Sequence, residues 1–333
     1  MANPVLVEVT RGGRVESRHR GAVCVMDADG AVVLSLGDVD VPVYPRSAVK
    51  AFQALPLLET GAADRFGLSE AEIAQACASH SGEPLHVETS AAMLRKAGRD
   101  VSCLECGAHW PRDESARALA AAGATPSALH NNCSGKHAGF VCVACGMDED
   151  PAGYVRASHP VQVAVARAVE DMTGTALDPA ECGTDGCSIP TYAIPLPALA
   201  QGFARFGTGL GLPPVRAAAA SRIRAAVAAH PWHVAGTGRF DTVVMNLLRA
   251  RAFTKTGAEG VYCAALPGEG LGIALKCDDG SGRGAEVMLA ALVDRFLPMD
   301  EAERAAMAAL ARPVLRNWNQ IVVGNLQPAG PLA

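Results

Sequence analysis

The stretch AVCVMDADGAVVLSL, residues 22–36, consists of two short apolar runs that flank an Asp-Ala-Asp-Gly segment. Apolar, β-branched runs of this length on either side of a glycine-containing turn predict a β-hairpin. A further apolar run at residues 5–9 is followed by Gly12-Gly13, which is a second turn signal. Residues 1–45 are therefore predicted to form an antiparallel meander.

Beyond this meander the pattern changes to helices and then returns to strands. Helix starts are indicated at Ser47, at Ser69 with Glu72 completing a capping box, near Pro84, at Asp113 and after Asn132, with Ala/Arg-rich helical stretches at 160–172 and 214–229. Strand patterns reappear after residue 240, at 260–266 and 272–276, before a helix near 285–296. This order predicts one mixed α/β (α+β) catalytic unit over residues 1–333. Its antiparallel sheet comes from both chain ends, about 1–45 and 240–333, and a large helical region is inserted at about 46–239.

The composition is that of a compact, enzyme-like protein, because 50% of the 333 residues are hydrophobic and 19% are charged. A net charge of -5 provides no general attraction for nucleic acid or for anionic membranes. The N-terminus lacks the features of a secretory signal and no apolar run approaches membrane-spanning length, so a cytoplasmic protein is expected. In a reducing compartment the 11 cysteines are expected to be thiols or metal ligands.

Lysine is scarce, since only five of the 29 basic residues are lysine. An amine can lose its proton near neutral pH and a guanidinium cannot, so the lysines are candidates for chemistry. One of them completes Ser47-Ala48-Val49-Lys50, an S-x-x-K sequence that on a helix places hydroxyl and amine one turn apart on one face. Burial and the helix N-terminus would both disfavour the ammonium form, which makes Lys50 a candidate base for Ser47. An exposed Ser and Lys on an ordinary amphipathic helix is the alternative.

The sequence KTG, residues 255–257, follows the S-x-x-K sequence in the order found in serine β-lactamases and penicillin-binding proteins. Between the two, SHSGE at residues 79–83 offers a hydroxyl where those enzymes have their S-D-N motif. Taken singly, a turn serine and a strand-end lysine are the alternatives. Together the motifs predict a Ser/Lys active site that contains Ser47, Lys50, Ser79 and Lys255.

The segment NNCSGKHAG, residues 131–139, is the densest polar cluster of the chain and precedes an apolar helical run. At a helix start the thiolate of Cys133 is stabilised, Lys136 lies one turn further on, and Cys187 occupies a second polar turn. Two thiolates and one further donor suit zinc, with a fourth position left open, although a lysine ligand is unusual because it must be neutral. A reactive or redox-paired thiol couple is the alternative.

Taken together, these segments resemble the class 3, rhizobial-type L-asparaginases, or asparaginase II family. The resemblance runs through most of the chain, and its most specific part is the nonapeptide at 131–139. The motifs that carry it are RSAVK (46–50), SHSGE (79–83), CGAHWP (106–111), NNCSGKHAG (131–139), DGC (185–187), DT (241–242), KTGAEG (255–260), GIALK (272–276) and DDG (278–280). Ser188 and Thr256 are small departures that replace no motif residue.

The resemblance implies a serine β-lactamase-like fold, a homodimer, and hydrolysis of L-asparagine to L-aspartate and ammonia. It also implies two Ser-Lys pairs, Ser47 with Lys50 and Ser79 with Lys255. On this interpretation Lys50 deprotonates Ser47 to form an acyl-enzyme, and the second pair relays the proton to the departing ammonia. The implied zinc ligands, which would help to orient substrate, are Cys133, Lys136 and Cys187. The candidates for binding substrate are Arg46, His80, Asn132 and Asp185, of which Arg46 and Asp185 would hold its carboxylate and ammonium groups.

Two other functions compete with this interpretation. A β-lactam or D-Ala peptide hydrolase would share the S-x-x-K and K-T-G motifs, but its substrates lie outside the inner membrane, and the N-terminus predicts a cytoplasmic protein. A metal or redox sensor built on Cys133 and Cys187 would leave the Ser/Lys pairs unexplained. The expected partner is thus a small molecule, L-asparagine, and neither nucleic acid nor a membrane is expected to bind.

Overall fold

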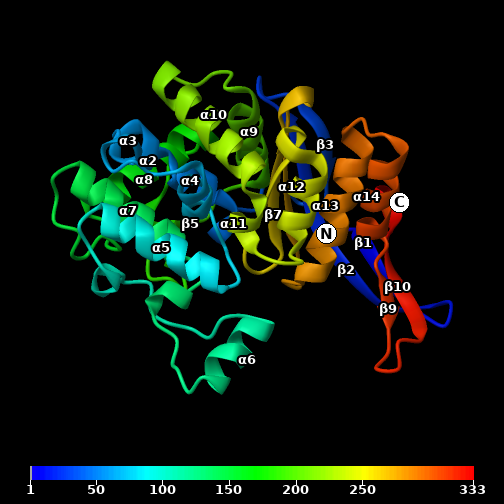
Figure 1. Cartoon of the computed structure of the whole chain (residues 1–333). Helices are drawn as coiled ribbons and strands as arrows, with labels where there is room; N and C mark the ends of the chain where they lie inside the picture. Colours follow the sequence, from blue (N-terminus) through cyan, green and yellow to red (C-terminus); the bar gives the residue numbers. More distant parts are fainter. Residues whose placement is uncertain (1) are drawn as a thin grey trace. The chain divides into compact units, whose positions relative to one another are not determined.

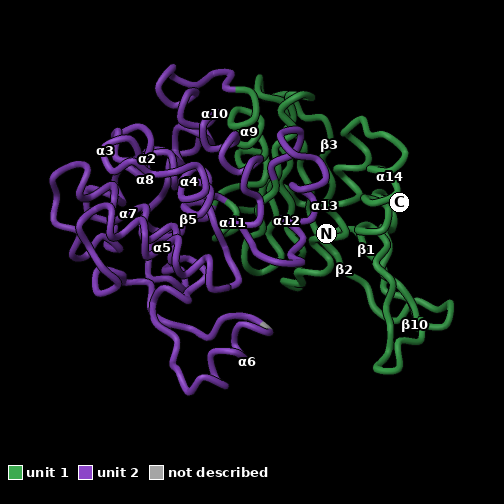
Figure 2. Tube along the Cα trace, viewed as in Figure 1, with its two compact units in different colours: residues 1–48, 194–208, 254–333 green, residues 49–193, 209–253 purple. Residues whose placement is uncertain are grey.

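The computed structural model describes residues 2–333. The chain forms two compact units, each assembled from more than one stretch (Figure 2): unit 1 from residues 1–48, 194–208 and 254–333, and unit 2 from residues 49–193 and 209–253. In this division helix α9 (Leu196–Thr208) belongs to unit 1, and residues 240–253 belong to unit 2. Sequence order alone had placed α9 in the helical region and residues 240–253 in the sheet region.

Unit 1 contains a sheet and the helices that cover it (Figure 1). Its strands are β1 (Val5–Arg11), β2 (Arg14–Asp27), β3 (Val32–Leu36), β6 (Phe253–Thr256), β7 (Val261–Leu266), β8 (Leu271–Cys277), β9 (Val314–Arg316) and β10 (Val322–Pro328). Besides α9, its helices are α13 (Gly282–Phe296) and α14 (Glu301–Ala311), with 3-10 turns η1 (Arg46–Val49), η6 (Pro267–Glu269) and η7 (Gly330–Leu332).

The long strand β2 organises the sheet, whose order is β6-β7-β8-β2-β1-β10-β9 with β3 also paired to β2. Strand β2 pairs antiparallel with its neighbours β1 and β3 in the sequence, and with β8 from the C-terminal part. Strand β1 pairs antiparallel with β10. These pairings confirm the predicted antiparallel sheet from both chain ends and the hairpin at residues 22–36. Strands β9 and β10 were not predicted, and neither was helix α14, although it begins with a capping box of Asp300 and Glu303.

Helices α9 and α13 cover opposite faces of this sheet. Gly272 of β8 lies against the backbone of α9 and pairs with Met26 of β2. Gly21 of β2 lies against Met288 of α13. Residues 21 and 26 are five positions apart on an unbroken strand pairing, so their side chains point to opposite faces. Burial on both faces explains why every residue of β7 is buried.

Unit 2 is mainly helical (Figure 1). Its helices are α1 (Lys50–Gln53), α2 (Leu55–Glu59), α3 (Ala62–Arg65), α4 (Glu70–Ala76), α5 (Pro84–Lys96), α6 (Asp113–Ala121), α7 (Ser134–Gly146), α8 (Pro160–Thr173), α10 (Pro214–Ala229), α11 (Pro231–Ala235) and α12 (Phe240–Leu248). The short pair β4 (Cys182–Thr184) and β5 (Pro190–Tyr192) and the 3-10 turns η2 (Val101–Cys103), η3 (Ala128–His130), η4 (Pro179–Glu181) and η5 (Arg249–Arg251) complete it. The predicted capping box of Ser69 and Glu72 is confirmed at the start of α4. Within residues 2–333, none of the helices has the length and apolar character needed to cross a bilayer.

We predict that Gly272→Ala destabilises the protein. A Cβ at this position would lie 1.9 Å from the carbonyl oxygen of Ala200 and 2.3 Å from the backbone nitrogen of Ala204, so α9 would have to move away from β8. Overpacking of this kind costs about 1–3 kcal/mol or more. The matched control is Gly268→Ala in η6, where nothing lies within 4 Å of the added Cβ and the change should stay within about 0.5 kcal/mol. Urea unfolding of the two variants tests this, and equal stabilities would contradict the close packing of α9 on β8.

Candidate active site

Arg46, Ser47 and Lys255 are the predicted site residues that belong to unit 1. Arg46 and Ser47 begin the 3-10 turn η1, and Lys50 is the first residue of α1. The S-x-x-K sequence therefore spans a 3-10 turn and a helix start instead of a single α-helix. Arg46 has a φ of 51°, a conformation that is costly for a residue with a side chain. Such backbone strain concentrates at functional sites.

The glycine of the K-T-G sequence explains how this sequence approaches the start of η1. A Cβ on Gly257 would lie 2.6 Å from the carbonyl oxygen of Pro45, which directly precedes Arg46. Only glycine therefore allows this approach. Lys255 on β6 is fully buried, and its Nζ donates a hydrogen bond of 2.9 Å to the carbonyl oxygen of Thr256.

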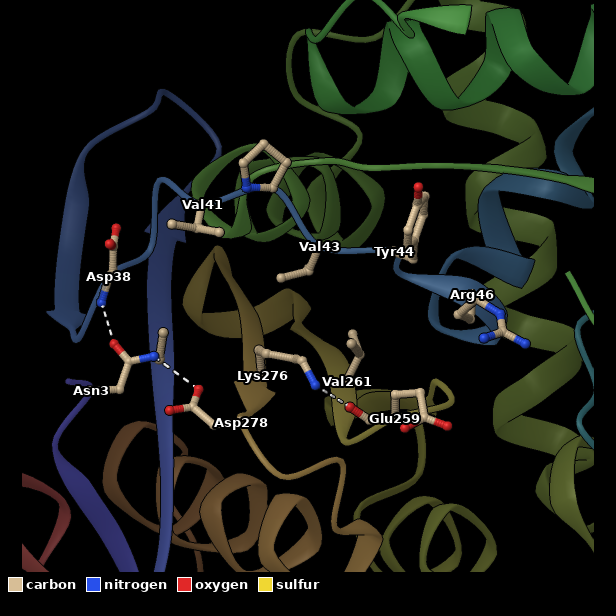
Figure 3. Close-up of a pocket in the computed structure, with 12 residues that line it drawn as sticks. Asn3, Asp38, Val41, Val43, Tyr44, Arg46, Glu259, Val261, Lys276 and Asp278 are labelled. Atoms are coloured by element: carbon tan, nitrogen blue, oxygen red, sulfur yellow. Dashed lines mark hydrogen bonds between the residues drawn. The ribbon is translucent and has the colours of Figure 1, made fainter. Parts of the chain in front are cut away.

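A recess of about 500 Å³ opens in unit 1 beside Arg46. Figure 3 shows Arg46, Glu259, Lys276 and Asp278 around it, with the backbone segment of residues 41–44 providing a largely apolar wall. The Lys276 amine donates to the carbonyl oxygen of Glu259. The recess thus presents both signs of charge next to an apolar surface, which suits a small zwitterionic molecule.

The other predicted site residues belong to unit 2, and Lys50 occupies the middle of their cluster. Its side chain is fully buried, and Nζ lies 3.0 Å from Ser79 Oγ and 3.1 Å from Cys133 Sγ. It also donates to the carbonyl oxygen of Ala78. The structure therefore brings Lys50 to Ser79, a serine that the sequence had paired with Lys255. An ammonium has three N–H donors, and these three acceptors match them.

Cys133, Cys187 and Lys136 form the adjoining part of the cluster. The Lys136 Nζ lies 3.1 Å from Cys187 Sγ. The hydrogen bond from the Cys187 thiol, together with the charges of Lys50 and Lys136, holds the pKa of Cys133 well below its usual value in spite of burial. The same hydrogen bond and burial raise the pKa of Cys187. Burial opposes the charge of Lys136, but the neighbouring Cys133, Cys187 and Asp185 raise its pKa. Cys133 is thus the member of the pair that loses its proton more readily.

The close approach of α7 to α4 places Cys133 beside Ser79. A Cβ on Gly135 would lie 2.3 Å from the carbonyl oxygen of Gln75, near the end of α4, so only glycine fits there. Cys133 is the residue before the first turn of α7, and its backbone N–H donates to Asn131 Oδ1 at 2.8 Å. The dense polar sequence at residues 131–139 is therefore explained by the Asn131 turn that precedes the helix and by close packing, as well as by its thiol.

His109 holds the segment next to Cys133, a contact that the spacing of the sequence did not indicate. The backbone N–H of Asn132 donates to His109 Nε2 at 2.8 Å, and the carbonyl oxygen of Asn132 accepts from the N–H of His80 at 3.1 Å. Asn132 Oδ1 lies 3.7 Å from Cys133 Sγ. The motif CGAHWP was visible in the sequence, but the partner of its histidine lies 23 residues away.

His80 is 1% exposed, and its ring is engaged on both sides. Its Nδ1 accepts from the N–H of Gly82 at 3.1 Å, so the proton is on Nε2, which lies 2.9 Å from Ser134 Oγ. Burial, followed by the charges of neighbouring groups, lowers the pKa of His80 well below its usual value. In this conformation the ring connects Gly82 to Ser134 through its two nitrogens, and neither nitrogen is available to a ligand.

Asp185 and Cys187 belong to the loop that joins β4 and β5. Asp185 Oδ1 accepts from the N–H of Gly186 at 2.7 Å, and Oδ2 lies 3.7 Å from Cys187 Sγ. Ser188 has a φ of 77°, which closes the loop through a hydrogen bond of 2.8 Å to the carbonyl oxygen of Asp185. Asp185 therefore orients the Cys187 thiol.

A buried amine against a serine hydroxyl, flanked by a thiolate, is an arrangement typical of hydrolases that work through an activated nucleophile. A family model described as L-asparaginase II matches residues 7–328. The chain therefore belongs to the L-asparaginase II family, and it is an asparaginase-type enzyme.

Comparison with other known proteins adds little to this assignment. No curated protein matches the chain. Among solved structures, one titled "Crystal Structure Analysis of Mglu" is 18% identical, with a TM-score of 0.38 over 85% of this chain and 69% of that one. A second, titled "Crystal Structure Analysis of Mglu in its tris and glutamate form", is also 18% identical, with a TM-score of 0.36 over 90% of this chain and 65% of that one. Similarity at this level supports no conclusion about fold or activity.

We predict that the buried histidines make the protein less stable at mildly acidic pH. Burial lowers the pKa of His86 to about 4, and His86 is fully buried where it stacks on His80 and Trp232. Below the unfolded value of about 6.5 the unfolded chain binds a proton that the folded protein does not, so the free energy of unfolding falls as pH drops toward 4.

For His86 alone, the loss between about pH 6.5 and pH 5 amounts to about 2 kcal/mol. His86→Gln should remove that part of the pH dependence. Urea unfolding of this variant and of the parent protein at about pH 7 and about pH 5 tests this. The same pH dependence in His86→Gln as in the parent protein would contradict the prediction.

Proposed function

We propose that this enzyme hydrolyses L-asparagine to L-aspartate and ammonia with serine nucleophile chemistry assisted by lysine. Family membership supports the asparaginase-type activity. The observation that carries the mechanism is the 3.0 Å contact between the buried Lys50 Nζ and Ser79 Oγ. A hydroxyl held this close to an amine can exchange its proton with that amine within one hydrogen bond.

The proposed reaction needs a proton to move from a serine to the leaving group. The serine oxygen attacks the side-chain amide carbon, and the amide nitrogen leaves as ammonia after it receives a proton. Water then cleaves the acyl ester, which releases L-aspartate and restores the serine. Ser47 remains the proposed nucleophile, on the basis of its S-x-x-K position, and Lys50 with Ser79 would carry the proton. Lys255 would assist as a second buried amine.

The proposed substrate contacts divide into direct and indirect ones. Arg46 borders the charged recess of unit 1, which supports a role in holding the substrate carboxylate. Asp185 is the proposed contact for the substrate ammonium, and its carboxylate also accepts from the Gly186 N–H and lies 3.7 Å from the Cys187 sulfur. Asn132 and His80 are better supported as positioning residues, because their hydrogen bonds connect the backbone beside Ser79 to that beside Cys133.

Zinc at Cys133, Lys136 and Cys187 is a further part of the proposal. The donor set fits the ion, because two thiol sulfurs and an amine meet in one buried cluster and sulfur and nitrogen are ligands that zinc prefers. A bound zinc ion would supply a positive charge that orients the substrate. Cys133 is already the thiolate of the pair, whereas Cys187 and Lys136 must each give up a proton to bind a metal.

We also propose a homodimer and a serine β-lactamase-like fold, which the family resemblance implies, and a cytoplasmic location. Size-exclusion chromatography with light scattering measures the first. Ammonia release from L-asparagine, compared with hydrolysis of the β-lactam nitrocefin, separates the proposed activity from that of a β-lactam hydrolase.

We predict that Lys50→Met and Ser79→Ala each lower kcat for L-asparagine by at least about a thousandfold. The two groups would transfer the proton together, so loss of either one removes the transfer. Ser81→Ala and Lys96→Met are matched controls. Ser81 is buried two residues from Ser79 but donates to the carbonyl oxygen of Ala235, and Lys96 pairs with Glu72. Both controls should retain activity within about tenfold.

Ser47→Ala decides which serine is acylated. Loss of activity in this variant with an acyl-enzyme absent from quenched reactions supports Ser47 as nucleophile, whereas an acyl group recovered on Ser79 assigns the attack to Ser79. Activity near that of the parent protein in folded Lys50→Met would contradict the proposed proton transfer.

We predict that Cys133→Ala removes bound zinc and raises KM for L-asparagine more than it lowers kcat, because the proposed role of the ion is to orient substrate. Zinc occupancy should fall as pH drops, since Cys187 and Lys136 regain their protons. Cys106→Ala is the matched control, a buried thiol whose sulfur donates to the carbonyl oxygen of Ala128. Metal analysis and full saturation curves test this, and zinc retained by Cys133→Ala would place the ligands elsewhere.

A further inference from the structure

A second cluster of metal-binding side chains lies in unit 1. His19 is on β2, Cys277 is the last residue of β8, and Asp279 lies in the turn that leads to α13. Cys277 pairs with Gly21, and His19 is two residues from Gly21 on the same strand. Because side chains two positions apart point to one face, His19 and Cys277 share the face that α13 covers.

The three side chains are already in contact. His19 Nδ1 lies 2.7 Å from Asp279 Oδ2, and Cys277 Sγ lies 3.0 Å from Asp279 Oδ1. All three donor atoms lie within 4.8 Å of one another, and among the side chains that the structure describes no other group of His, Cys, Asp and Glu meets this condition. His19 and Cys277 are buried, whereas 48% of the Asp279 side chain is exposed, which leaves a path from solvent.

We propose that His19, Cys277 and Asp279 bind a divalent transition-metal ion, Zn²⁺ in the first instance, separately from the proposed zinc in the active site. Sulfur, imidazole nitrogen and carboxylate oxygen are the three kinds of ligand that zinc uses in proteins. Zinc bonds of roughly 2.0–2.3 Å place tetrahedral donors about 3–4 Å apart, so small side-chain movements would complete the site. The fourth position would face solvent beside Asp279 and take a water molecule.

The first turn of α13 is shaped to leave room for this cluster. A Cβ on Gly284 would lie 2.9 Å from His19 Cγ and 3.0 Å from Cys277 Sγ. Glycine within a helix costs about 1 kcal/mol relative to alanine. The close approach of the helix backbone to both potential ligands therefore explains a residue that helix formation disfavours.

Binding would rearrange the hydrogen bonds in a defined way. The exposed Arg283 donates through Nε to His19 Nε2 at 3.2 Å, so the His19 proton is on Nδ1 without metal. Coordination through Nδ1 moves this proton to Nε2 and turns Arg283 toward solvent. The Cys277 thiol donates its proton to Asp279 Oδ1 without metal, and this proton must leave when the sulfur binds an ion. Each bound ion would thus release one proton, from Cys277.

A metal ion at this site would stabilise the folded protein. The ion would join β2 to the end of β8 and the turn that leads to α13, and 260 positions in the sequence separate His19 from Asp279. An ion that binds the folded protein and not the unfolded chain raises its stability. Activity is therefore not the readout that decides the proposal.

The test uses the full chain, stripped with a chelator and titrated with Zn²⁺ by calorimetry in buffers of different ionisation enthalpy, and with Co²⁺ by absorption spectroscopy. A Cys133→Ser/Cys187→Ser background removes the proposed active-site zinc. In that background we expect one equivalent of metal to bind with release of one proton and with a thiolate-to-cobalt charge-transfer band. Adding Cys277→Ser should abolish all three signals, and adding the control Cys103→Ser should leave them intact.

A background variant that binds no metal, or binds it equally well with Cys277→Ser, overturns the proposal. Asp279→Asn provides a second test that keeps the thiol. It should retain the cobalt band and weaken binding by about tenfold or more, and unchanged affinity in a protein shown to be folded by circular dichroism also overturns the proposal. Loss of metal in Cys133→Ser alone concerns only the proposed function, so the two sites can fail independently.

Discussion

The buried amine of Lys50 is the constraint on which the rest of the candidate site depends. A polar group removed from water is costly unless hydrogen-bond partners surround it, and Lys50 Nζ has partners in Ala78, Ser79 and Cys133. The first two follow the end of α4 and the third precedes α7, so these helices must approach closely. Gly135 permits that approach. The thiolate of Cys133 then requires its own partners, which are the Cys187 thiol and Lys136. One buried amine thus accounts for the positions of two helices and a loop.

Much of this site could be predicted from the sequence, because its motifs are local. The S-x-x-K sequence correctly marked Lys50 as a buried amine, and the polar nonapeptide marked a helix start with a special cysteine. The serine that lies against Lys50 could not be predicted in the same way. Ser79 is 29 residues from Lys50, and Cys133 is 83 residues from it. Such contacts depend on how α4 and α7 pack, which spacing along one segment does not encode.

In the fold as well, elements with a local sequence signal were predicted, and features that depend on contacts between distant segments were not. Alternating apolar runs and turn residues predicted β2, β3, β7 and β8, and the capping box predicted the start of α4. The partition into units was harder to predict, because α9 is an amphipathic helix within a helical stretch and only its packing against β2, β7 and β8 assigns it to the sheet. Strand β9 has only three residues, and the apolar pattern of β10 is interrupted by Gly324-Asn325, so neither shows the continuous run that identifies a strand in a sequence.

The pairing of β2 with β8 has a consequence for how the chain is synthesised. The register joins Gly21 to Cys277, so β2 emerges from the ribosome long before its partner strand exists. Until then β2 can pair only with its neighbours β1 and β3, and one edge of its apolar second half, residues 21–26, is left open. Non-local pairing of this kind is slow, because a long loop must close before the contact forms. The helical unit 2, whose contacts are formed within residues 49–253, is complete earlier. The nascent chain therefore carries an unpaired strand while most of the protein is made, and during that interval it depends on protection from aggregation.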